Sequence, residues 1–200
     1  MRQRTRVFAS HEARGLRAVT RRSDPRDVEK IVRNLERRSK AVDLRETEKL
    51  PALWGKWKLL YSNALPGGPT GTSSDVVGDV FQVIYEGGER VDHEVQFNLG
   101  NRSSRQGTTS WSLDNATPSG TVAAVLKHKC KIEVPRTVTI TLEKVELGIG
   151  ELHVELPTLP EFLQPPDWTR SSTFDITYLD DELRVARGDR GELRVFLREG

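Results

Sequence analysis

The strongest constraint on the fold is an alternation of apolar and polar side chains that recurs from residue 53 to the end of the chain. In the clearest stretch, Val91, Val95 and Phe97 alternate with acidic and amide residues. A period of two residues is typical of strands that bury one face. About eight to ten such stretches follow one another, separated by turns such as Pro66–Gly68 and Gly188–Gly191. Because few helical stretches interrupt them, the sequence predicts a mainly β, antiparallel barrel or sandwich.

One helix is predicted ahead of these strands, over residues 24–40. Asp24 suits the N-cap and Pro25 the first helical position. An apolar stripe follows at helical spacing and consists of Val28, Ile31, Val32 and Leu35. Basic side chains occupy the other faces. Two interpretations stay open: the basic face attracts anionic lipid headgroups, or the helix packs on its own domain and leaves that face solvated.

Charge is distributed unevenly along the 200 residues, although the net charge is only +2. Residues 1–49 carry fifteen Lys or Arg and eight Asp or Glu, a net +7, whereas residues 50–200 carry a net −5. We therefore divide the chain into a segment over 1–22, a helix region over 23–49 and a β domain over 50–200. The first segment is Arg-rich and acid-poor, as in a transit peptide or its remnant; a frayed basic tail is the alternative. An acidic β domain argues against nucleic acid as a partner.

Composition and motifs exclude several classes of protein. A single cysteine cannot build a disulfide framework or a cysteine-based zinc site. The longest uncharged run, Leu59–Ser74, has sixteen residues and many glycines and prolines, so no transmembrane helix is predicted. The nucleophile-elbow, phosphate-loop and dinucleotide-binding motifs are not found. We expect no enzyme activity and no cofactor.

Three side chains with metal-binding chemistry, His93, His128 and Cys130, fall on predicted inward faces. They could hold a soft metal if their strands are neighbours, but their spacing fixes no pair of ligands locally. We expect interior packing and no metal. The acidic turn Asp180–Glu182 is expected to be structural, because charged hairpin tips are usually solvated and arginines lie beside it.

Three stretches resemble the plastid lipid-associated proteins, also called plastid fibrillins. They are Leu53–Ser62, Val77–Ile84 together with Val91–Val95, and Thr177–Gly191, which reads TYLDDELRVARGDRG. The three occur in the family's order over residues 24–198, whereas residues 98–172 match the family only loosely.

The resemblance implies a lipocalin-like antiparallel β-barrel preceded by a short N-terminal α-helix. It implies a chloroplast location, in plastoglobule, thylakoid or stroma, and non-enzymatic binding of apolar lipids of the quinone, carotenoid or isoprenoid type. Two alternatives stay open. The protein could be a structural coat of lipid droplets with a filled barrel, or an accessory partner of an enzyme of isoprenoid or quinone synthesis.

Seven residues are candidates for lining the barrel interior, because their side chains fall on predicted inward faces. They are Trp57, Leu59, Tyr61, Phe97, Trp111, Leu126 and Tyr178.

The sequence Gly55-Lys56-Trp57 also resembles the G-x-W of lipocalin first strands, in which the Trp closes one end of the barrel and a last-strand Arg packs across its ring. Arg187 or Arg184 could supply that arginine here. Plain core packing of Trp57 is the other interpretation.

A proline-rich segment over Leu156–Trp168 interrupts the strands, because proline removes a ladder donor. Three of its side chains, Phe162, Leu163 and Trp168, are candidates for contact with a membrane, since Trp suits the headgroup boundary. Alternatively they cover the barrel or pack on the helix.

Overall fold

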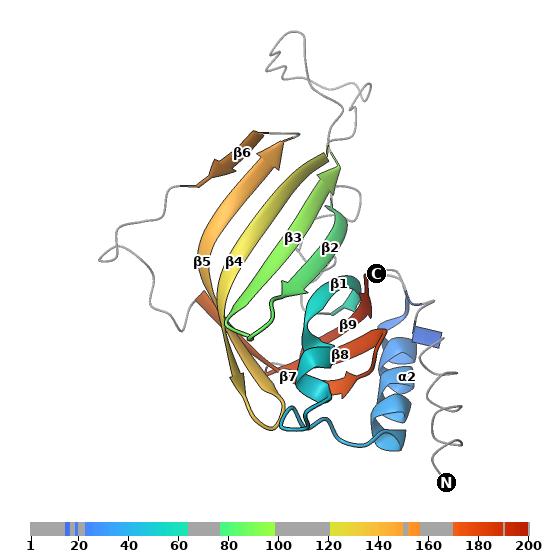
Figure 1. Ribbon diagram of the computed structural model, residues 1–200. Helices are drawn as coiled ribbons and strands as arrows, with labels where there is room; N and C mark the ends of the chain where they lie inside the picture. Colours follow the sequence, from blue (N-terminus) through green and yellow to red (C-terminus); the bar gives the residue numbers. More distant parts are fainter. Residues whose placement is uncertain are drawn as a thin grey trace, which may run out of the picture.

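The computed structural model describes residues 15–16, 19, 23–63, 77–98, 121–149, 152–156, 170–189 and 191–199, and the side chain of Phe97 lies outside that description (Figure 1). Its strands are β1 Gly55–Ser62, β2 Val77–Ile84, β3 Arg90–Asn98, β4 Thr121–Glu133, β5 Thr137–Ile149, β6 Leu152–Glu155, β7 Ser171–Leu179, β8 Leu183–Gly188 and β9 Leu193–Arg198. Two helices precede them, α2 Pro25–Arg38 and α3 Lys49–Leu53. None of the described helices combines the length and apolarity needed to cross a bilayer.

Eight strands form a closed circuit of antiparallel pairings. Following the hydrogen bonds leads from β1 through β2, β3, β4, β5, β7, β8 and β9 and back to β1, while β6 is added to β5. Each strand of the circuit pairs with the next one along the chain, apart from the omission of β6. The prediction of a mainly β, antiparallel fold is therefore confirmed. Within this circuit every strand has a paired neighbour on each side.

Four register shifts interrupt the described strand pairings, and two of them change which side chains face inward at predicted positions. In β1 the register passes from Leu59 opposite Phe196 to Tyr61 opposite Val195, so one residue is extra. In β7 a similar shift separates Ile176 from Tyr178. An extra residue moves all following side chains to the other face of the strand.

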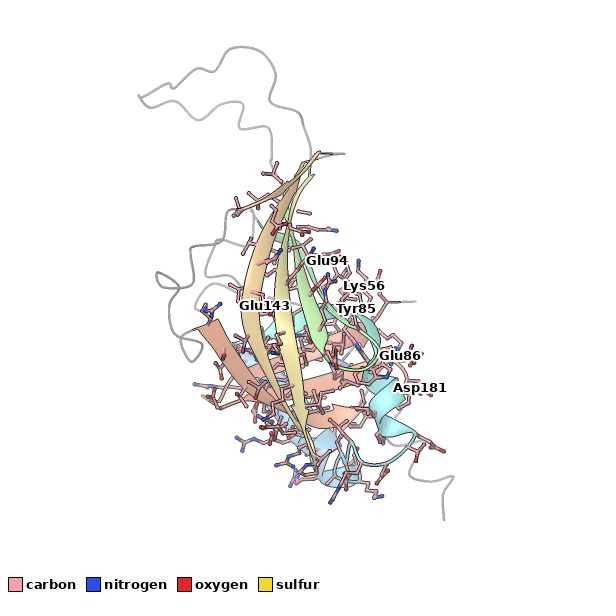
Figure 2. The ribbon with its side chains drawn as sticks, turned by 60° about the vertical axis from the view of Figure 1, so that its left-hand side comes forward. Lys56, Tyr85, Glu86, Glu94, Glu143 and Asp181 are labelled. Carbon is pink, nitrogen blue, oxygen red and sulfur yellow. The ribbon has the colours of Figure 1, made fainter. Side chains whose placement is uncertain are left out.

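The first core cluster lies within the circuit, because every strand of the circuit contributes to it. Its strand residues are Trp57, Leu59, Val80, Ile84, Val91, Val95, Cys130, Val138, Ile140, Phe174, Ile176, Leu179, Ala186 and Phe196. The opposite face of β1–β3 carries charged side chains around the apolar ring of Phe81. Figure 2 shows Lys56 and Glu94 there, and Lys56 Nζ lies 2.5 Å from Glu94 Oε2 across β2. Inside and outside are thus distinguished by chemistry as well as by pairing.

The second core cluster joins α2 to the outside of the circuit (Figure 1). The helix begins as the sequence suggests: Asp24 is the N-cap, and its carboxylate accepts a hydrogen bond from the Arg26 amide at 2.8 Å. The apolar stripe packs on outward side chains of β1, β7, β8 and β9. The buried members of the cluster are Leu16, Val19, Val28, Val32, Leu35, Tyr61, Tyr178, Leu183, Val185, Leu193 and Val195. The apolar stripe is therefore occupied by the domain itself, and the basic residues remain on the exposed side.

Arg187 holds α2 against β8 by ion pairs. Its guanidinium donates to Glu36 at 2.8 and 3.0 Å and to Glu29 at 3.1 and 3.3 Å. Burial opposes ionisation of Glu29, but hydrogen bonds from Arg33 and Arg187 outweigh it, so the pKa of Glu29 is lowered. The hydrogen bonds to Glu36 raise the pKa of Arg187. The geometry is chelating and partly shielded, so this pair of contacts stabilises more than an exposed ion pair does.

We expect Arg187→Met to lower the free energy of unfolding by about 1–3 kcal/mol, since it leaves two carboxylates without their cation. Because the Glu29 pKa is lowered on folding, its contribution is present at pH 7 and is lost as the pH falls below about 4. Urea unfolding at pH 7 and pH 3.5 measures both effects. Arg33→Met, which removes only an exposed partner of Glu29, is the control and should change stability by less than about 0.5 kcal/mol. Equal effects of the two variants would contradict this account.

Candidate functional site

One end of the circuit is closed around Trp57. Its side chain is fully buried, and the indole Nε1 donates to the Leu53 carbonyl at 2.9 Å. Two guanidinium groups lie over its ring: Arg198 Cζ is 4.3 Å and Arg184 Cζ 4.9 Å from the ring centroid. Cation–π contacts in a desolvated site are worth about 2 kcal/mol. Trp57 is thus fixed by two cation–π contacts and by a hydrogen bond to the preceding helix.

Arg198 is the last-strand arginine that completes this end. It is the direct register partner of Trp57 in the β1–β9 pairing. Its guanidinium donates to the carbonyls of Asp181 and Trp54, both at 2.7 Å, and to that of Ala52. One side chain therefore ties together β9, the β7–β8 turn and the end of α3.

The predicted alternatives for this arginine are resolved by the structure. Arg187 is not the residue, because it lies outside the circuit against α2. Arg184 does pack on Trp57, but as the inner of two arginines. Gly55 also belongs here: its φ is +116°, and a Cβ at this position would stand 2.9 Å from Arg198 Nη1. Only glycine fits both the backbone conformation and the approach of Arg198.

The segment before β1 covers the same end. Val42, Leu44 and Leu53 are buried in the interior cluster. The Leu44 amide donates to the Pro135 carbonyl in the β4–β5 turn at 2.6 Å, which fastens the segment across the circuit. In Figure 1 this connection passes along the end of the strands between α2 and β1. Residues 42–54 therefore form a cover, which we call the end cover.

A chain of polar side chains extends from Arg184 across the apolar interior. Arg184 Nη2 donates to Gln82 Oε1, which orients the amide. The Gln82 amide nitrogen then faces His93 Nε2 at 2.6 Å. The His93 and His128 rings meet edge to face with their centroids 4.7 Å apart. Each polar group in this chain comes from a different strand, so the chain bridges the inside of the circuit.

The environment keeps these groups in defined protonation states. Burial, followed by the positive charges of His128, Arg194 and Arg184, lowers the pKa of His93 to about 3. Burial and the charges of Arg198 and Arg194 lower the pKa of Arg184 to about 9, so Arg184 is a cation and His93 is neutral at pH 7. Burial also raises the pKa of the Cys130 thiol to about 11, which makes it a poor nucleophile.

Arg184 is the only charged side chain that is fully buried in the described part of the chain. Its Nε and Nη1 have no hydrogen-bond partner there. The Phe196 ring, 4.2 Å from Arg184 Cζ, and the Trp57 ring make cation–π contacts with it and offset part of the desolvation cost.

Three interior positions beyond Arg184 remain partly accessible. His93 is half-buried, as is its direct register partner Leu126. Leu142, which pairs with His128, is half-buried as well. These residues share the inner face with Val91 and Cys130, yet they are less covered. Within the described residues, no three His, Cys, Asp or Glu side chains are placed to hold a metal ion.

The structure separates the predicted interior residues into three groups. Trp57, Leu59 and Leu126 belong to the interior cluster. Tyr61 and Tyr178 do not: both lie in the cluster under α2, because the two bulges turn them outward. Their predicted inward orientation was wrong. The side chain of Phe97, together with Trp111, Phe162, Leu163 and Trp168, lies outside the described residues, so their predicted roles stay predictions.

Sequence reasoning missed three interior residues, Gln82, Arg194 and Arg198, and named Arg184 only as a partner for Trp57. A signal for Arg184 was present: in Leu183–Ala186 it is the one charged residue within an apolar run. Alternation along that run places Arg184 on the same face as Ala186, which is inside. Arg198 gave no such signal, because its inward position follows from pairing with β1.

Comparison with known proteins identifies the family. The chain matches the PAP_fibrillin family over residues 5–197, and it belongs to that family. It is 34% identical over 184 residues to plastid-lipid-associated protein 6, chloroplastic, of Arabidopsis thaliana. That match covers 84% of this chain and 60% of the relative, so the chain spans about three-fifths of the relative's length. No solved structure gives a significant match. The resemblance to plastid fibrillins is thereby confirmed.

We expect Arg198→Met to lower the free energy of unfolding by about 2–4 kcal/mol, because three hydrogen bonds and one cation–π contact are lost together. Chemical denaturation followed by tryptophan fluorescence measures this. Arg45→Met is the matched control, since Arg45 is exposed and paired only with Asp43 nearby in the chain; it should leave the midpoint unchanged. An Arg198→Met midpoint equal to that of the control would contradict the closure described above.

The lowered pKa of His93 predicts a loss of stability in mild acid. The unfolded state binds a proton near pH 6.5 and the folded state only near pH 3, so stability is full above pH 6.5 and falls below it. Between pH 7 and pH 5 the cost is about 2 kcal/mol. The quantity to measure is the difference in unfolding free energy between the unmutated protein and His93→Gln across that range. A difference that does not vary with pH would show that His93 titrates normally in the fold.

Proposed function

We propose that the circuit of eight strands is a lipocalin-like β-barrel that binds an apolar lipid of the quinone, carotenoid or isoprenoid type in its interior. The observation that carries the proposal is the interior cluster, to which every strand of the circuit contributes and which the end cover shields on one side. Burying a lipid chain against such side chains is favourable by about 25 cal/mol per Å² of apolar surface. Sites of this kind bind mainly through apolar contact, with a few polar groups for orientation.

The residues divide into a closed end and a binding region. Trp57, with its two arginines, supports the closed end. Leu59 and Leu126 line the interior, and the partly accessible positions at His93, Leu126 and Leu142 mark the region where a ligand meets the wall. We propose that Phe97 and Trp111 continue this lining.

We propose a binding role without catalysis. Each side chain with potential catalytic chemistry is either held in an unreactive protonation state or engaged in hydrogen bonds that stabilise the fold. The Cys130 pKa is raised to about 11. Asp180 accepts hydrogen bonds from the amides of Glu182 and Leu183 and from the Tyr178 hydroxyl, so it shapes the β7–β8 turn. No nucleophile and base are paired among the described interior residues.

We propose a plastid location, at plastoglobules, thylakoid membranes or in the stroma. Its support is membership of the PAP_fibrillin family and the similarity to a relative named as chloroplastic and plastid-lipid-associated. Because the apolar stripe of α2 is buried against the domain, membrane contact would use exposed basic residues and the predicted contacts Phe162, Leu163 and Trp168.

The proposal predicts that a charge inside the circuit abolishes ligand binding while the same charge outside does not. Leu126 faces in and its neighbour Val125 faces out, opposite Glu94 and Glu146. We expect Leu126→Glu to weaken binding of a decyl-benzoquinone at least about tenfold, which corresponds to losing about 1.4 kcal/mol of apolar contact, and Val125→Glu to leave it unchanged. Quenching of tryptophan fluorescence on titration measures the affinity.

A second interior variant guards against loss of folding. Leu126→Trp keeps the site apolar but fills it, and should also weaken binding. If the unmutated protein bound no quinone, carotenoid or isoprenoid, the carrier role would fail, and a coat role with a filled barrel or a docking role on a biosynthetic enzyme would take its place.

A further inference from the structure

We propose that His93 presents an N–H donor that binds a carbonyl oxygen of the ligand, so that the interior prefers quinones over hydrocarbons of the same size. This inference rests on the proposed function and narrows it to one of the ligand classes named there. It depends on the order of donors and acceptors along Arg184, Gln82 and His93.

The first step is the orientation of the Gln82 amide. A guanidinium group has donors and no acceptor, so the Gln82 atom that contacts Arg184 Nη2 must be the carbonyl oxygen. The amide –NH₂ group is therefore directed to the other side, where it meets His93 Nε2 at 2.6 Å. Arg184 is fully buried and in contact with two aromatic rings, and a turned-over amide would place its –NH₂ group against this donor.

The second step is the tautomer of His93. The Gln82 nitrogen can only donate, so His93 Nε2 must accept, and the ring carries no proton there. A neutral imidazole then bears its proton on Nδ1. Burial and the neighbouring cations keep the ring neutral. Three residues on three strands thus set one N–H donor on the inner wall.

The third step is the availability of that donor. Within the described residues, the hydrogen bond of His93 uses Nε2, and Nδ1 has no hydrogen-bond partner. His128 is different, because its Nδ1 lies 2.9 Å from the Leu126 carbonyl. The His93 residue is half-buried although it lies inside the circuit, and the proposal places the ligand against this part of the inner wall. An unused N–H donor in an apolar wall favours a partner with an acceptor.

The N–H donor of His93 indicates the chemical class of the ligand. A neutral N–H donor matches a neutral acceptor on an otherwise apolar molecule, which describes a quinone carbonyl. A pure hydrocarbon such as a carotene has no acceptor and would leave the donor unpaired. Specificity built on a buried hydrogen bond is sharper than specificity built on apolar contact alone.

The experiment compares two ligands in three proteins. The ligands are an alkylated benzoquinone and the alkylbenzene with the same chain and ring substitution. In the unmutated protein we expect the quinone to bind about five- to tenfold more tightly. In His93→Phe the ratio should fall to about one, with the alkylbenzene affinity kept. In the control Val125→Phe, which changes an outward-facing residue of β4, the preference should remain.

Gln82→Leu tests the positioning role of Gln82 without touching the ligand-binding ring. We expect ¹⁵N NMR of the unmutated protein to show His93 protonated on Nδ1 and bare on Nε2, and the variant to show a mixture of tautomers with a reduced quinone preference. Because the tautomer is read in the unmutated protein, the test survives misfolding of a variant.

The outcomes separate the two proposals. Equal affinity of the unmutated protein for both ligands, or a proton on His93 Nε2, overturns this inference and leaves the lipid-binding role standing. Failure of both ligands to bind overturns the lipid-binding role itself.

Discussion

The rest of the structure depends on the contact between Trp57 and Arg198, which joins the first strand to the last. Pairing of β1 with β9 closes the circuit, and Arg198 then reaches the carbonyls at the end of α3 and in the β7–β8 turn. Closing the circuit at this point separates an inner face of the strands from an outer face. It also holds the end cover in place, so that the interior is shielded from water on one side before any ligand is considered.

The strands near this closure are buried on both faces, and each face has a separate task. Leu183 and Val185 pack under α2, whereas Arg184 and Ala186 face the interior. The packing of Leu183 and Val185 under α2 holds β8 in place from its outer face. The strand can therefore accommodate the charged Arg184 at one of its inner positions. Arg184 in turn fixes Gln82 and, through it, His93. The polar chain is thus a consequence of the packing outside the circuit as well as inside it.

Periodicity along the chain was sufficient for most of the strands, because each strand of the circuit contributes apolar side chains to the interior cluster. It was insufficient wherever the register changes. The bulge after Leu59 turns Tyr61 outward, and the bulge before Tyr178 turns Tyr178 outward, so both side chains join the cluster under α2. Alternation in the sequence does not indicate where a strand contains an extra residue. Gln82 and Arg198 were missed for a related reason: their places depend on which residue of a distant strand lies opposite, and that is a property of the closed circuit.

The central claim is that the circuit encloses a single apolar molecule, and native mass spectrometry tests it most directly. The protein would be incubated with a plastid lipid extract, repurified and measured under conditions that preserve non-covalent complexes. The account predicts one bound molecule per chain, and extraction followed by fragmentation should identify it as a quinone. A spectrum containing only the unliganded chain, from a sample in which the extract still holds free quinone, would contradict it.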